Sequence, residues 1–411
     1  MGFTESQWDM LQSELSTIKE RSPFYARKFD GIDMAAIRTQ SDFESLPFSE
    51  KDDLRAAYPL GLQVVPDEEV VRIHSSSGTT GTPVIIPYTR QDVEDWATQF
   101  ARCYEMAGIT PVDRIQITPG YGLWTAGIGF QLGAERLGAM AIPMGPGNTD
   151  KQLQMMQDLR STVICATSSY ALLLAEEISK RGLRDKVHLR KGVIGSERWG
   201  DKMRQRIQGE MGIEIYDIYG LTEVYGPGIG ISCDAHAGMH IWDDFVYIEV
   251  VDPDTGQVLP EGEVGELVLT TLRKQGAPLI RYRTHDLTRI IPGTCPCGSR
   301  HPRIDTLTGR TDDMFKVKGC NMFPAQVEEV IKATDGTSSE YQVMIEAVDG
   351  HDVLTVLFET PLAGDDLKRC EEELALIFKA KLGCTPEAKG VAMGELPRSE
   401  KKTKRIFDSR Y

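Results

Sequence analysis

The run of residues 74–83, with the sequence HSSSGTTGTP, constrains what this chain can fold into more than any other stretch. It lies between two apolar segments, residues 70–73 and 84–86, that we expect to be strands. Every residue from 75 to 82 is glycine or carries a hydroxyl, so the run cannot bury itself, but its N–H groups and hydroxyls can surround an anion. It is not a Walker A loop, because two residues separate Gly78 from Gly81 and no lysine follows. An ordinary surface loop can have the same composition, so the rest of the chain has to decide.

The length and charge of the chain narrow the class of protein. With 411 residues it is too long for one ordinary core, so two or three domains are expected. The formal net charge of −15 argues against nucleic-acid and anionic-membrane partners. The sequence shows neither a membrane-spanning apolar run nor a secretory leader, and we expect a cytoplasmic protein. Eight scattered cysteines then favour reduced thiols or a metal site over disulfides.

The order of apolar segments predicts the fold class. Strands alternate with helices before about residue 240, which predicts an α/β fold with a largely parallel sheet. An antiparallel β part follows, and from about residue 313 the pattern is that of a compact α+β domain. We therefore expect a large N-terminal domain of mixed and parallel sheets with helices, residues 1–311, and a small mobile α+β C-terminal domain, residues 312–411. The individual segments expected are strands at 115–117, 139–143, 161–166, 247–251, 265–271, 341–347 and 354–359, and helices at 4–21, 89–107, 149–159, 170–181, 324–333 and 365–382.

Further along the chain, short motifs combine glycine, hydroxyl, aromatic and charged residues. An aromatic side chain such as Tyr219 can stack on a purine, and carboxylates such as Glu223 and Asp286 can hold Mg²⁺ or the hydroxyls of a ribose. Each motif also has an ordinary explanation: a capped turn, a plain loop, a strand-end ion pair, a charged linker or a basic solvated tail. The motifs are GSERW at 195–199, YDIYGLTE at 216–223, RYRTHD at 281–286, GRTDD at 309–313 and PRSEKKTKR at 397–405.

In this fixed order the motifs resemble those of the adenylate-forming acyl-CoA synthetases, and most closely the phenylacetate–CoA ligase family. The resemblance runs from about residue 23 to the end of the chain. It implies a two-domain enzyme in which a carboxylic acid attacks the α-phosphorus of ATP, giving an acyl-adenylate and pyrophosphate, and the thiol of coenzyme A then displaces AMP. The finer motifs that carry it are YGLW at 121–124, GAERLGA at 133–139, GNT at 147–149, DIYGLTE at 217–223 and PLIRYRT at 278–284.

The resemblance also implies which residues bind the nucleotide. Tyr219 would stack on adenine with Asp217 near its amino group, and Asp286 and Arg310 would hold the ribose. Thr222 would contact phosphate during catalysis. The implied nucleotide-binding set is Ser75, Ser76, Ser77, Gly78, Thr79, Thr80, Gly81, Gly195, Ser196, Glu197, Asp217, Ile218, Tyr219, Gly220, Thr222, Asp286 and Arg310.

Charged residues implied by the resemblance complete the reaction centre. Glu223 would hold Mg²⁺, and Asp312 would be the hinge about which the small domain turns. Lys402 would be the catalytic lysine, whose ammonium stabilises the negative charge that gathers as the acid meets the phosphate. Two positions depart from the family pattern: Thr82 replaces a common lysine, and Lys401 replaces a common glycine. Either Lys401 or Lys402 could therefore reach the site, and the register favours Lys402.

Three cysteines and a histidine form a candidate zinc site. Cys233 and His240 precede the antiparallel part of the chain, and Cys295 and Cys297 follow it. Three thiolates and an imidazole suit structural Zn²⁺, although the spacing is not that of a zinc finger. His236 and His301 are the alternatives to His240, and four free side chains are the alternative to a metal site.

A candidate wall for the acyl group follows the strand at 115–117. Tyr121, Trp124, Gly127 and Gly129 lie on one expected loop, and a flat aromatic acid can stack on such a surface. The alternative is that Trp124 belongs to the core.

The expected ligands are therefore an aromatic carboxylic acid, ATP, coenzyme A, Mg²⁺ and structural Zn²⁺, and the assembly could be a homodimer. A neighbouring hypothesis is an adenylating enzyme that passes the acyl group to a carrier-protein thiol or adenylylates a deazaflavin. A hypothesis of another class is a degenerate nucleotide-binding protein stabilised by zinc. The presence of Glu223, Asp286, Arg310 and Lys402 argues against degeneration.

Overall fold

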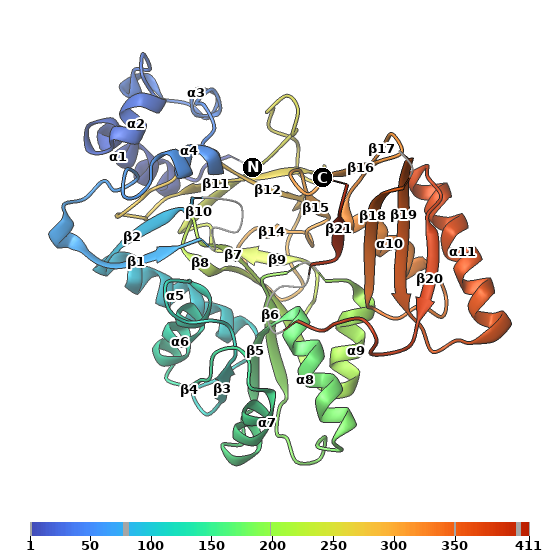
Figure 1. The fold of residues 1–411 in the computed structure, drawn as a ribbon. Helices are drawn as coiled ribbons and strands as arrows, with labels where there is room; N and C mark the ends of the chain where they lie inside the picture. Colours follow the sequence, from blue (N-terminus) through green and yellow to red (C-terminus); the bar gives the residue numbers. More distant parts are fainter. Residues whose placement is uncertain (1, 77–81, 198, 349–350, 400–403, 411) are drawn as a thin grey trace.

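A computed structural model describes residues 2–76, 82–197, 199–348, 351–399 and 404–410 of the chain. The molecule consists of a large α/β body and a separate C-terminal α+β domain, which lies to the right in Figure 1. The expected fold class is thereby confirmed. Among the described residues, no helix combines the length and the apolar character that crossing a bilayer requires.

A nine-stranded sheet forms the centre of the large body, in the order β13-β14-β9-β8-β7-β6-β5-β3-β4. Its strands from β7 to β4 run parallel, as the alternation of strands and helices predicted. The parallel strands are β3 (Arg114–Ile117), β4 (Met140–Pro143), β5 (Val163–Thr167), β6 (Lys191–Gly195) and β7 (Glu214–Leu221). The helices between them are α6 (Ala126–Leu137), α7 (Thr149–Asp158), α8 (Ser168–Lys180) and α9 (Asp201–Met211).

Antiparallel strands extend this sheet beyond β7 and build a second sheet. The extension consists of β8 (Gly226–Ser232), β9 (Met239–Ile241), β13 (Ile290–Ile291) and β14 (Arg303–Ile304). The second sheet has the order β10-β11-β12-β15. Its strands are β10 (Val246–Val251), β11 (Gly265–Thr271), β12 (Tyr282–Thr288) and β15 (Gly309–Arg310), and the antiparallel pairing of β10 with β11 confirms the expectation.

The run at residues 74–83 begins within a two-stranded pair. The strands are β1 (Val70–Ser75) and β2 (Ile85–Thr89), and α5 (Arg90–Met106) follows directly. Thr89 is the predicted N-cap of α5, since its hydroxyl accepts from the Asp92 amide at 3.1 Å. Trp96 and Phe100 of α5 are fully buried and pack against α6.

Short helices precede β1, at the upper left of Figure 1. The first helix begins at the predicted capping box, with the Gln7 side chain accepting from the Thr4 amide at 2.8 Å. The set comprises α1 (Glu5–Arg21), α2 (Pro23–Lys28), α3 (Gln40–Glu44), α4 (Lys51–Ala56) and the 3-10 turns Met34–Ala36 and Asp67–Glu69.

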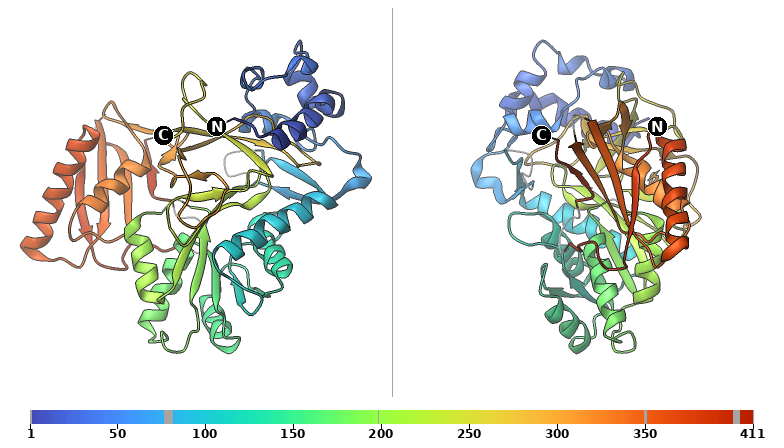
Figure 2. Two further views of the ribbon diagram at one scale, coloured as in Figure 1. Left: turned by 180° about the vertical axis from the view of Figure 1, so that it is seen from behind. Right: turned by 45° about the vertical axis from the view of Figure 1, so that its right-hand side comes forward.

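The C-terminal domain has its own buried core and a four-stranded sheet in the order β20-β19-β18-β21. The two outer strands run parallel to their neighbours, which brings the end of the chain back into the domain. The elements are β16 (Phe315–Val317), β17 (Cys320–Met322), α10 (Pro324–Ala333), β18 (Tyr341–Val348), β19 (His351–Glu359), α11 (Gly364–Leu382), β20 (Glu387–Val391) and β21 (Ile406–Asp408). Figure 2 shows this sheet beside the large body from two further directions.

Candidate active site and candidate metal centre

A chain of polar contacts joins residues of β7, β12 and β15. The Tyr219 hydroxyl donates to Asp286 Oδ2 at 2.7 Å, and Arg310 donates to Asp286 Oδ1 at 3.0 Å. Arg310 also donates to both carboxylate oxygens of Asp312, at 2.8 and 2.9 Å. The pairing of β12 with β15 sets Asp286 opposite Arg310, so the sheet itself fixes their contact. Burial raises the pKa of the Asp286 carboxyl, and the Arg310 guanidinium opposes that shift. The fold thus brings together four residues that the sequence singled out.

The turn after β7 presents a hydroxyl and a carboxylate. Thr222 Oγ1 lies 3.0 Å from Thr125 Oγ1, at the start of α6. Glu223 is buried, and Lys51 Nζ of α4 lies 3.0 Å from its Oε1. The geometry of this ion pair is not that of a hydrogen bond, and among the described residues Glu223 Oε1 makes none. Glu223 is therefore a buried carboxylate whose Oε1 already faces one cation.

Lys51 is a residue of this candidate site that the sequence analysis missed. It lies in α4, and its partner Glu223 follows β7. No spacing rule connects such distant positions. The signal that could have drawn attention to it is the replacement of the usual loop lysine by Thr82, which predicts that a cation comes from elsewhere.

The loop before α6 is fastened to the start of the run at 74–83. The Leu123 carbonyl accepts from the Ser75 amide at 2.9 Å and lies 3.2 Å from His74 Nδ1. Burial lowers the pKa of His74 to about 4, so its imidazole is neutral at pH 7 with the proton on Nδ1. Ser76 bonds Val84 through its backbone and through its hydroxyl, both at 3.0 Å. The predicted residues Ser77, Gly78, Thr79, Thr80 and Gly81 lie outside the described residues.

The expectation that the acyl wall is a single loop is wrong for two of its members. Gly127 and Gly129 belong to α6 rather than to the loop before it. At both positions the absence of a side chain lets the helix pack closely against its neighbours. A Cβ on Gly127 would lie 2.7 Å from the Tyr121 ring, and one on Gly129 would lie 2.5 Å from the Trp96 ring. The Tyr121 ring therefore packs directly against Gly127, while Gly129 lies against α5. Trp124 is 44% exposed, so it does not belong to the core.

Residues predicted near the adenine have partners in α8, in α9 and in the segment before α9. Both carboxylate oxygens of Asp217 are engaged, Oδ1 by the Trp199 indole at 2.7 Å and Oδ2 by the Arg204 guanidinium. The Glu197 carboxylate accepts from Ser168 and Ser169 at the start of α8. The backbone beside them is tightly packed, because a Cβ on Gly195 would lie 2.4 Å from the Ile218 carbonyl and one on Gly220 would lie 2.1 Å from the Gly226 carbonyl. Ser196 adopts a positive φ of 71°.

The segment expected to carry the catalytic lysine approaches the large body. Lys401 and Lys402 lie outside the described residues. Arg398, just before them, donates to Glu176 of α8 at 2.7 Å and to Glu359 of β19 at 2.8 Å. The tail is thus fixed to both parts of the molecule at this point.

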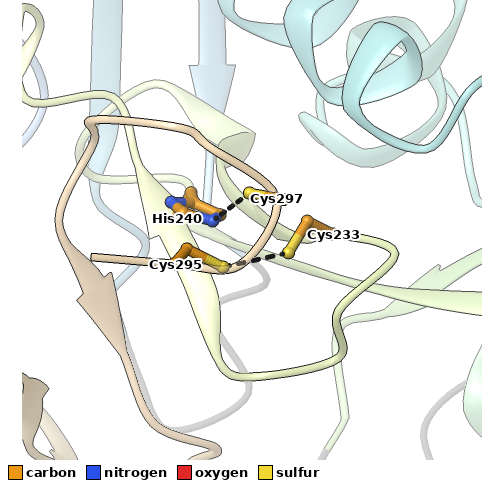
Figure 3. A group of neighbouring side chains, drawn as sticks. All are labelled: Cys233, His240, Cys295 and Cys297. Carbon is orange, nitrogen blue, oxygen red and sulfur yellow. Dashed lines mark hydrogen bonds between the residues drawn. The ribbon is translucent and has the colours of Figure 1, made fainter. Parts of the chain in front are cut away.

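The four predicted zinc ligands converge on one place, shown in Figure 3. Their ligand atoms all lie within 4.8 Å of one another. Cys233 Sγ is 3.6 Å from Cys295 Sγ, and Cys297 Sγ is 3.3 Å from His240 Nε2. His240 Nδ1 lies 2.9 Å from the His301 carbonyl, which leaves Nε2 as the ligand atom. His240 is the histidine that the structure brings to the cysteines, while His301 Nδ1 contacts Asp243 and His236 Nε2 contacts Glu214.

The fold and the polar site define the class of protein: an adenylate-forming enzyme. A family model described as AMP-binding enzyme matches residues 24–272, and one described as AMP-binding enzyme C-terminal domain matches residues 319–410. The phenylacetate–coenzyme A ligase of Escherichia coli strain K12 is 42% identical over 98% of this chain and 94% of its own length. The chain therefore belongs to the phenylacetate–CoA ligase family, and it is an AMP-forming acid–CoA ligase.

Solved structures of a 2-hydroxyisobutyryl-CoA ligase, 27–28% identical, resemble the whole chain to different degrees. Its postadenylation state with R3-HIB-AMP matches with a TM-score of 0.89, covering 98% of this chain and 89% of that one. Its thioesterification state with 2-HIB-AMP and CoA matches with a TM-score of 0.72, covering 99% and 89%. The arrangement of the two parts of this chain is thus closer to the first of these structures.

Proposed function

We propose that the acid activated by this ligase is aromatic and of the phenylacetate type. The observation that carries the proposal is the contact of Leu123 with Ser75 and His74. It holds the loop with Tyr121 and Trp124 against the start of the phosphate-binding run. An aromatic acid stacked on that loop would have its carboxylate directed toward the α-phosphate, which is the orientation that attack requires.

The nucleotide would lie against the chain of contacts from Tyr219 to Asp312. Asp286 would accept from the ribose hydroxyls, and Arg310 would orient it. Asp217 would act indirectly, because both of its oxygens already have protein partners. Ser75, Ser76 and Thr222 would contact the phosphates with the residues at 77–81.

Glu223 fits the role of a Mg²⁺ ligand, because it places a buried carboxylate directly after β7 and Mg²⁺ prefers oxygen ligands. Bound Mg²⁺ would neutralise phosphate charge. Lys51 would supply beside it the positive charge that Thr82 does not. Glu223→Gln keeps the side-chain shape and should lower pyrophosphate release about a hundredfold while raising the Mg²⁺ concentration needed for half-maximal rate.

The cluster of Cys233, His240, Cys295 and Cys297 fits structural Zn²⁺. Three sulfurs and one imidazole nitrogen are the soft and borderline donors that zinc prefers, and the His301 carbonyl orients the imidazole. The ion would fasten the loop between β13 and β14 to the end of β8.

We place the boundary between the domains at residues 311 and 312, with Asp312 as the hinge. The C-terminal domain would turn there between the two half-reactions, and Lys402 would act in the first. The bidentate pair of Asp312 with Arg310 would then anchor the hinge to the nucleotide site.

A comparison of acids tests the proposal. Purified enzyme with ATP and Mg²⁺ is assayed for pyrophosphate release with phenylacetate, benzoate, anthranilate and, as the contrasting acid, 2-hydroxyisobutyrate. We expect the highest kcat/KM with phenylacetate and AMP formation that requires CoA. A preference for 2-hydroxyisobutyrate would overturn the aromatic assignment, and AMP formation that ignores CoA would indicate another acceptor.

A further inference from the structure

A lysine of the large body reaches into the C-terminal domain and ends among main-chain carbonyls. Lys202 belongs to α9, and its Nζ donates to the carbonyls of Ile331, Thr334 and Thr337 at 2.9, 3.0 and 3.1 Å. It donates also to Thr337 Oγ1 at 2.7 Å. These acceptors lie at and just after the C-terminal end of α10. Figure 2 shows α9 next to the C-terminal domain.

The acceptors suit an ammonium for two physical reasons. The last carbonyls of a helix lack partners within the helix, and the helix dipole places partial negative charge there. Thr337 Oγ1 is itself bonded to the carbonyls of Ile331 and Thr334, which holds all of the acceptors in one small concave group. An ammonium has three N–H donors, and the four acceptors around Lys202 Nζ are enough to engage all of them.

Other charged contacts cross between the two parts near this point. Lys332 pairs with Asp201, and both side chains are more than half exposed at 59% and 56%. Arg398 pairs with Glu176. An exposed pair contributes little, whereas a half-buried ammonium with several acceptors contributes more. Among the described residues, Lys202 and Arg398 are therefore the two charged contacts at this interface that are partly buried and make several hydrogen bonds, and of the two only Lys202 reaches the end of α10.

We propose that Lys202 is a positioning residue for the first half-reaction: by capping α10 it holds the C-terminal domain in the arrangement that forms the acyl-adenylate. The proposal rests on the hinge motion proposed above. Rotation about Asp312 would carry Ile331, Thr334 and Thr337 away from α9, so the contact would belong to one arrangement and be lost in the other. The residues of α9 that are buried are Met203, Ile207 and Met211, so Lys202 does not belong to the face by which this helix packs in the large body.

The test compares the two half-reactions in Lys202→Met. Acyl-adenylate formation is measured by ATP–pyrophosphate exchange, and thioester formation by reaction of supplied acyl-adenylate with CoA. We expect exchange to fall about tenfold to a hundredfold, the effect of losing hydrogen bonds to a charged group. Thioester formation should stay at the wild-type rate or rise. Lys332→Met is the matched control, since it removes an exposed ammonium from the same interface and should change neither rate by more than about twofold.

Equal loss of both half-reactions in Lys202→Met, or no loss in either, would overturn the proposal. The thermal midpoint of Lys202→Met shows whether the variant is folded. Lys202→Gln keeps an amide group that can donate hydrogen bonds, so ATP–pyrophosphate exchange should fall less in this variant than in Lys202→Met. Small-angle scattering with a bound acyl-adenylate analogue gives a second readout: the curve of Lys202→Met should depart from that of wild type. The wild-type control separates this proposal from the proposed function. If wild-type enzyme forms no acyl-adenylate with aromatic acids, the proposed function is wrong, whatever the variants do.

Discussion

At the scale of single residues, Lys274 is an ammonium surrounded by aromatic rings. It is 2% exposed, and its Nζ lies 3.2 Å from the centre of the Tyr88 ring and 4.5 Å from that of Tyr225. Burial lowers its pKa to about 7, while the carboxylates of Asp92 and Asp95 oppose that shift. Attraction of the cation to the ring faces replaces part of the lost hydration.

The depressed pKa predicts a specific dependence of stability on pH. Between pH 7 and the ordinary lysine pKa of about 10.4, the unfolded chain binds the proton more than the folded chain does. The free energy of unfolding of wild type therefore gains from this group as pH rises through that window, by at most about 1.4 kcal/mol per pH unit. Lys274→Met lacks this gain, so the free energy of unfolding of the variant relative to wild type should fall from pH 7 to pH 9 in urea unfolding. A difference between the two proteins that does not change with pH would contradict the assignment.

Asp286 is predicted to bind ATP rather than to perform chemistry. Asp286→Asn keeps an acceptor for Tyr219 but removes the charge that faces Arg310, so the KM for ATP should rise about tenfold with a smaller change in kcat. Asp305→Asn, which alters an ion pair with Arg289 nearer the surface, is the control. An unchanged KM for ATP in steady-state kinetics would show that Asp286 does not hold the ribose.

The individual residues of the site were predictable to different extents. Tyr219, Asp286 and Arg310 belong to motifs whose order is informative, and the structure brings them together. Lys51 could not be found, because its contact with Glu223 depends on how the N-terminal helices pack. The partners of Asp217 were missed for the same reason, since Trp199 and Arg204 reach it only through the packing of α9 against β7.

At the scale of elements, the candidate metal centre depends on two very short strands. The pairing of β14 with β9 sets Arg303 opposite His240 and thereby brings the loop with Cys295 and Cys297 to the end of β8. Strands of two or three residues contribute few ladder bonds. The metal would therefore be expected to supply much of the stability of this region.

Removal of zinc is expected to loosen this region before the rest of the protein. Metal analysis should give about one zinc per chain. Cys295→Ser or treatment with a strong chelator should lower the thermal midpoint and expose the amides around residues 290–304 to hydrogen exchange, while Cys370→Ser in the C-terminal domain, whose thiol contacts the Asp335 carbonyl, should not release zinc. If the purified protein contains no metal and hydrogen exchange around residues 290–304 is unchanged by the chelator, the proposed zinc site is wrong.

Most of the longer elements and the four-residue strands β3 and β4 were predictable, and the two-residue strands were not. The helix predicted at 324–333 has those bounds, because a proline at its start and periodic apolar residues define it locally. Strands such as β13 and β15 are too short for periodicity to indicate. The end of the chain, where a basic solvated tail was the alternative, contains β21, whose pairing with β18 is set by the C-terminal sheet rather than by its own sequence.

At the scale of the whole molecule, two parts have to cooperate in two half-reactions. Lys402→Ala should lower acyl-adenylate formation about a thousandfold, because a fixed ammonium stabilises the charge of that transition state. Thioester formation from supplied acyl-adenylate should persist. Lys401→Ala, the neighbouring control, should leave both steps close to wild type. Loss of adenylate formation in Lys401→Ala with retention in Lys402→Ala would exchange the roles of the two lysines.

The parallel pairing of β21 with β18 makes the lysine-bearing segment a tether. Its ends are held at Arg398 by two carboxylates and at Arg405 by a 2.8 Å bond from the Val343 amide to its carbonyl. Seven residue steps separate these ends, 405 less 398, so the span can reach at most about 25 Å. Adding or deleting one residue there would shift where each ammonium arrives without altering any side chain. If a lysine of this segment acts in the first half-reaction as proposed, the length of the tether would decide, as much as the presence of lysine, which ammonium reaches the acid.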